Sequence, residues 1–93
     1  STINIASMSL SDLEQARTVQ SAQYAAMNAS SSVRLAGITL MSCCTLAALA
    51  LGRAADHLDA ISYNTSAQQV AYEREEAFRE FQQAVQLWNA QAC

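Results

Sequence analysis

The sequence predicts an all-α fold, a helical hairpin in which one very long helix is followed by a shorter antiparallel return helix. The 93-residue chain has no proline and only two glycines, Gly37 and Gly52, so the residues that usually form tight turns are almost absent. Hydrophobic residues make up 52% of the chain and charged residues 14%, against roughly 25% charged residues in an average soluble domain. This composition favours helix nearly throughout, and the length suits a single helical domain, 1–93.

The long helix is predicted to begin near Asp12. Ser11 and Glu14 have the spacing of a capping box, and the two acidic side chains suit a helix N-terminus. The preceding residues, 1–10, show only a short alternating pattern, and we interpret them as a flexible or partner-ordered arm.

The long helix is predicted to continue over about 12–61. The glycines and the serine run 30–32 each weaken a helix by at most about 1 kcal/mol, so none of them obliges the helix to end. A break near 30–32 is left open. The polar segment 62–66 offers two overlapping capping boxes and forms the turn. A return helix over about 67–90 completes the predicted hairpin.

A line of small apolar residues follows the long helix in steps of three and four, the spacing of a coiled-coil seam. Small side chains at such positions let a second helix approach closely. The return helix carries larger side chains at the same spacing, and these are predicted to pack on the second half of the line. The residues predicted to pack within the chain are Ala47, Ala50, Ala54, Phe78, Phe81, Val85 and Trp88.

The lengths of the two helices indicate which part of the seam remains uncovered. At about 1.5 Å per residue the long helix would span about 75 Å and the return helix about 36 Å, which reaches back only to about Ala36. We expect a second copy of the chain to cover the rest, in a homo-oligomer or filament. The predicted interface comprises Val19, Ala22, Ala26, Ala29, Val33, Ala36 and Leu40. The alternative is a fold back at 30–32 into a three-helix bundle, without glycine or proline at the corner.

The segment 35–52 is uncharged and apolar on all sides of the predicted helix, so it must be buried in protein or in lipid. A single-span membrane protein, a subunit of a membrane complex with lipid around 35–52, is therefore the alternative. Thr39, Ser42 and Thr45, and the lack of tyrosine or tryptophan at either end of the segment, argue against a span. We expect burial in an oligomeric helical core instead.

The sequence carries no pattern typical of catalysis or of cofactor binding. Five widely spaced arginines and a net charge of −3 provide no surface for nucleic acid. The neighbours Cys43 and Cys44 lack metal-ligand spacing, and His57 has no nucleophile to activate. Cys93 is a candidate for an intermolecular disulfide in an oxidising compartment. We predict no enzyme, no cofactor, no metal and no small-molecule substrate.

The sequence therefore predicts a structural or interaction subunit that self-assembles through helix packing. A role in a secretion or phage-type machine is the hypothesis that the predicted shape suggests. For localisation, a secreted or multi-subunit assembly is favoured, with a membrane second.

Overall fold

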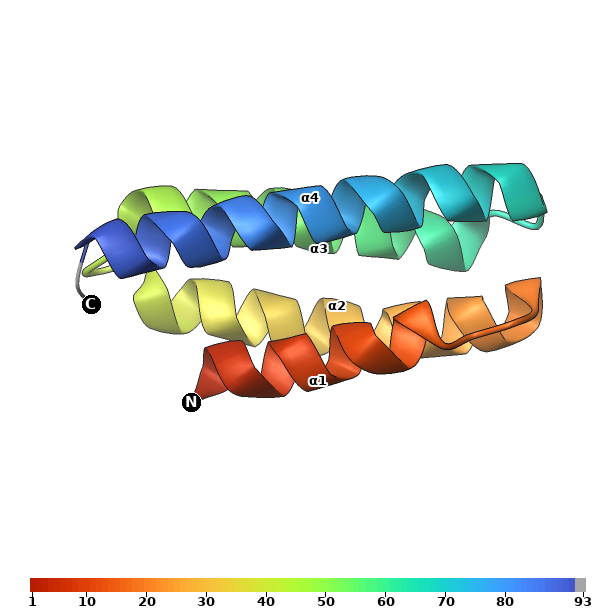
Figure 1. The fold of residues 1–93 in the computed structure, drawn as a ribbon, viewed down its shortest axis with the longest axis horizontal. Helices are drawn as coiled ribbons and strands as arrows, with labels where there is room; N and C mark the ends of the chain where they lie inside the picture. The colour runs from red at the N-terminus through yellow and green to blue at the C-terminus, as the bar shows by residue number, and fades with distance from the viewer. Residues whose placement is uncertain (92–93) are drawn as a thin grey trace.

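Four helices run alternately up and down along one long axis (Figure 1). They are α1 (Thr2–Glu14), α2 (Val19–Leu40), α3 (Thr45–Tyr63) and α4 (Ala67–Gln91). The structure is a computed structural model that describes residues 1–91, with extents of 38 × 19 × 16 Å. The pair α1–α2 lies against the pair α3–α4, and the start of α1 and the end of α4 lie at the end of the bundle where α2 turns into α3.

The all-α class is confirmed, but the predicted two-helix hairpin is wrong. The region 12–61 is not one helix, because the chain turns at 15–18 and again at 41–44. The predicted arm, 1–10, belongs to α1. The last helix begins at Ala67, and its bounds lie within one residue of those predicted for the return helix.

Neither additional turn uses glycine or proline. At the first, Thr18 caps α2: its hydroxyl accepts from the Ser21 amide at 3.0 Å, and the Ser21 hydroxyl accepts from the Thr18 amide at 3.1 Å. At the second, the Cys44 amide donates to the Leu40 carbonyl at 2.8 Å and so satisfies an unpaired carbonyl at the end of α2. The turns are local, and the apolar surface that they allow the chain to bury stabilises them.

The serine run does not break α2, and two of its three side chains join neighbouring helices. Ser30 is buried and donates to Asp59 of α3 at 2.5 Å. Ser32 and Ser9 of α1 share a hydrogen bond of 3.0 Å. Ser31 bonds back to the carbonyl of its own helix, an ordinary arrangement for a helical serine. The run therefore fixes α2 between α1 and α3.

The core is built from small side chains that allow close helix contact. Ala47, Ala50 and Ala54 of α3 are fully buried. Gly37 marks a close approach of α2 and α3, since a Cβ placed there would lie 3.4 Å from the Ala48 carbonyl oxygen. Where small residues lie at a helix crossing, the two backbones come close together. Their contact fills the space that larger side chains would otherwise fill.

The segment 35–52 does not form the continuous apolar helix that a span requires, because the turn at 41–44 divides it. Among residues 1–91, no helix combines the length and the apolar character needed to cross a membrane. The alternative of a single span over 35–52 is therefore contradicted within the part of the chain that the structure describes.

Candidate interaction surface

The predicted interface residues lie inside the bundle. Six of the seven, Ala22 to Leu40, are at most 8% exposed and belong to one core cluster with residues of all four helices. Val19 is partly buried against the same cluster. The extra turns bring the chain's own helices over this seam, so the uncovered surface from which the interface was inferred does not exist in the folded chain.

The residues predicted to pack within the chain lie in that same core cluster. The three alanines of α3 are completely buried. Phe78, Phe81, Val85 and Trp88 of α4 are partly buried and pack against the cluster. Large side chains of α4 thus lie beside small side chains of the other helices.

The outer face of α2 carries a second apolar line that was not among the predicted site residues. Tyr24, Met27, Leu35 and Ile38 are 71%, 60%, 54% and 72% exposed. With Ser31 between them they follow steps of three, four, four and three residues, which places all five on one side of the helix, opposite the buried alanines. We call these five residues the outer stripe.

A shallow groove between α2 and α3 borders the outer stripe at the end near the turn. Ile38, Met41 and Ala48 form its apolar walls, and Gly37 and Gly52 lie in it. A Cβ at Gly52 would meet no atom within 4 Å, so the groove is open there. The groove extends the outer stripe at Ile38, and the charged side chain of Arg34 also lines it.

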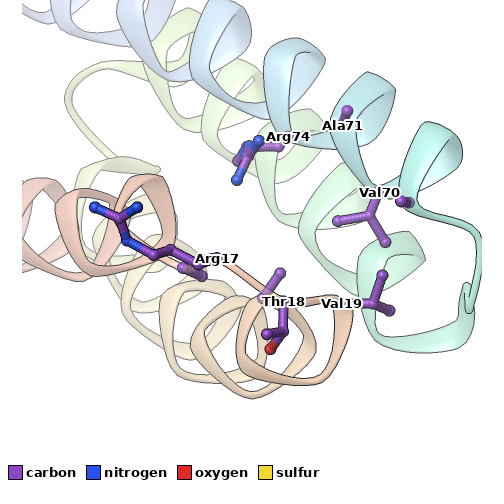
Figure 2. Close-up of a pocket in the computed structure, with 9 residues that line it drawn as sticks. Arg17, Thr18, Val19, Val70, Ala71 and Arg74 are labelled. Atoms are coloured by element: carbon purple, nitrogen blue, oxygen red, sulfur yellow. The ribbon is translucent and has the colours of Figure 1, made fainter.

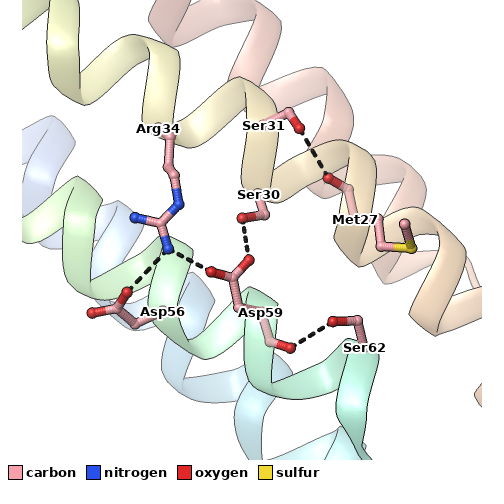
Figure 3. Close-up of polar contacts among 7 residues, drawn as sticks. All are labelled: Met27, Ser30, Ser31, Arg34, Asp56, Asp59 and Ser62. Atoms are coloured by element: carbon pink, nitrogen blue, oxygen red, sulfur yellow. Dashed lines mark hydrogen bonds and ion pairs between the residues drawn. The ribbon is translucent and has the colours of Figure 1, made fainter.

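The single charged residue of α2 is paired within the chain. Arg34 Nη2 lies 3.1 Å from Asp56 Oδ1 and 2.5 Å from Asp59 Oδ2, both in α3 (Figure 3). The hydrogen bond to Asp59 and then that to Asp56 raise the pKa of Arg34. Burial raises the pKa of Asp59, but the hydrogen bonds from Ser30 and Arg34 and the positive charge of Arg34 outweigh it, so the net pKa is lowered.

The lowered pKa of Asp59 predicts a loss of stability in acid. The contribution is complete above the unfolded-state pKa of about 3.9 and is lost as the pH falls through the lower folded-state value. Because Asp59 and Arg34 are 41% and 45% exposed, solvent screening limits the effect to less than about 1 kcal/mol. Urea unfolding between about pH 5 and pH 2 should show a smaller acid-induced loss in Asp59→Asn than in the unmodified chain.

The matched control is Asp12→Asn on the exposed surface of α1, where no ion pair of the described residues is removed. Its acid profile should follow that of the unmodified chain. Equal acid profiles for Asp59→Asn and Asp12→Asn would contradict the role assigned to Asp59.

Polar side chains link α3 to α4 by one hydrogen bond and one ion pair. His57 Nδ1 lies 2.7 Å from Glu73 Oε1, and Arg53 Nε lies 3.2 Å from Glu80 Oε2. Within residues 1–91, no three histidine, cysteine, aspartate or glutamate side chains come together as a metal site would require. The histidine thus joins two helices and has no nucleophile among its hydrogen-bond partners.

A hollow near the start of α2 and α4 is lined by Arg17, Thr18, Val19, Val70, Ala71 and Arg74, with three alanines (Figure 2). The arginines come from the α1–α2 connection and from α4, and neither forms an ion pair among the described residues. Thr18, the hydroxyl residue of the lining, is engaged in capping α2. The hollow therefore presents cationic and apolar groups but no carboxylate or thiol for acid–base or nucleophilic chemistry.

The cysteines differ in their surroundings. Cys43 is an exposed free thiol in the turn between α2 and α3, and Cys44 is completely buried. Cys93, the candidate for an intermolecular disulfide, lies outside the described residues. Comparisons of the chain with protein-family models, with curated proteins and with solved structures each gave no match.

Proposed function

We propose that the chain is a structural or interaction subunit whose binding surface is the outer face of α2. The observation that carries this proposal is the outer stripe: four large apolar side chains, each more than half exposed, along a helix with a single charged residue. A row of large exposed apolar side chains along one helix face is typical of a binding site.

The opposite side of the bundle has a different character. The outer surface of α4 is mainly polar and charged, with Glu75, Arg79, Gln83 and Gln86 exposed beside the aromatic Tyr72. Such a face is well hydrated and gains little from contact with another protein. The asymmetry supports a bundle that faces solvent with α4 and a partner with α2.

Site-specific photo-cross-linking tests this proposal. We expect p-benzoylphenylalanine in place of Tyr24 to form a covalent adduct with a protein in cells that make the chain. The same amino acid in place of Tyr72 should form none. Tyr72 is a matched control, because it is also a tyrosine and is 55% exposed, but it lies on α4.

A second change connects the adduct with the apolar surface. Ile38→Glu would bury an unpaired carboxylate in the contact, so it should lower the adduct yield from position 24 at least about tenfold. Circular dichroism should remain unchanged, since Ile38 is 72% exposed and contributes little to the core. Equal yields from positions 24 and 72, or an adduct that survives Ile38→Glu, would contradict the proposal.

A further inference from the structure

We propose that the partner of this surface is a second copy of the chain, bound antiparallel about a two-fold axis at Ser31. This inference rests on the proposed function and adds the identity and the direction of the partner. Its first support is the spacing of the outer stripe, which is the same in both directions from Ser31. Met27 and Leu35 lie four residues away on either side, and Tyr24 and Ile38 lie seven residues away.

A two-fold axis at Ser31 would place complementary side chains opposite each other. Met27 would face Leu35 of the second copy at about 6 Å along the helix from the axis, and Tyr24 would face Ile38 at about 10 Å. Each large side chain then meets one of similar size. Ser31, the smallest member, would lie at the crossing, where a small residue lets two helices approach closely. Such a self-complementary contact is what a two-fold dimer requires.

The charge distribution also favours a second copy on this face. The chain carries a net charge of −3, so two copies repel each other at most orientations. On α2 the single charge, Arg34, is already paired with Asp56 and Asp59. Because α2 itself carries no carboxylate, contact through its outer stripe brings together the least acidic helix of each copy. It also keeps the acidic helices α4 on the outer sides of the pair, because α2 and α4 have little contact within each bundle.

The available area sets the expected strength of the dimer. The four large side chains of the stripe, each more than half exposed, form a small contact, at or below the lower limit of about 1,200 Å² for a specific interface. Interfaces near this limit are typical of weak, reversible association. Sedimentation velocity of the full chain from about 1 to 500 µM should therefore show a reversible monomer–dimer equilibrium.

Charge substitutions at paired positions test the direction of the contact. Met27→Lys and Leu35→Glu, made singly, should each raise the dissociation constant at least about tenfold, since each buries an unpaired charge. Combined in one chain they should restore dimerisation at low salt, because in the antiparallel pair each introduced lysine faces an introduced glutamate. In a parallel pair like charges would meet, and the combined variant would associate more weakly than either single variant.

Tyr24→Lys combined with Met27→Glu is the matched control. It adds the same two charges to the same stripe, but at positions that do not face each other in the antiparallel pair, so it should remain monomeric. Circular dichroism should show all variants folded, because the altered side chains are exposed.

The outcomes separate the two proposals. A dimer without recovery in Met27→Lys/Leu35→Glu overturns the antiparallel arrangement. A monomer at all concentrations, with adducts from position 24 to a different protein, overturns the second copy as partner and leaves the proposed function standing. Absence of any adduct from position 24 overturns the proposed function itself.

Discussion

Leu51→Ala is expected to lower the free energy of unfolding by about 2–5 kcal/mol. Leu51 is completely buried in α3, and its Cβ lies 3.5 Å from the position that a Cβ of Gly37 would occupy. The facing residue of α2 therefore has no side chain that can move into the space left by the deletion. Because the cavity cannot collapse, the variant loses both the transfer free energy of the deleted atoms and the packing contacts around them.

Urea unfolding followed by circular dichroism measures this loss. Leu46→Ala is the matched control, with the same substitution in the same helix at a side chain that is 54% exposed. It should change the free energy of unfolding by less than about 1 kcal/mol. Similar losses for the two variants would show that the buried face of α3 is not the one described here.

Ala29→Leu is expected to destabilise the chain by about 1–3 kcal/mol, by overpacking. Ala29 is completely buried near the middle of α2, in the core cluster shared by the four helices. A leucine there must displace neighbouring helices or adopt a strained rotamer. If the line of small residues in α2 were instead an interface between subunits, Ala29→Leu would abolish assembly and leave the single chain stable.

The free energy of unfolding distinguishes these two outcomes. It should fall for Ala29→Leu at a protein concentration low enough to exclude association. Ala90→Leu, on the exposed surface of α4, makes the same change outside the core and should have an effect within about 0.5 kcal/mol. An Ala29→Leu chain as stable as the Ala90→Leu chain would show that α2 is not packed as described.

The sequence was sufficient for the helical class and the start of α4, but not for the turns at 15–18 and 41–44. Thr18 pairs with Ser21, whereas the usual capping-box pattern expects glutamate or glutamine at the third position. Cys44 is the N-cap residue of α3, but its side chain forms no capping hydrogen bond. Turns without glycine or proline leave little local signal in the sequence, because burial of the helices against each other stabilises such turns more than turn chemistry does.

The heptad line from Val19 correctly marked a buried face, but periodicity does not tell which helix covers it. A seam covered by another subunit and a seam covered by the same chain have the same spacing. The outer stripe was overlooked for a related reason: Leu35 and Ile38 were interpreted as residues buried in a larger core or in lipid. Only the bundle shows that they remain exposed.

The order of the helices in Figure 1 has a consequence for how fast the chain folds. Most contacts between helices join helices that are neighbours in the sequence, and the contact between α1 and α4 is small. Contacts that are close along the chain require little loop-closure entropy, so folding in the microsecond to millisecond range is expected. The three successive helix pairs would form first, and the meeting of α1 with α4, the most distant pair in the sequence, would complete the structure.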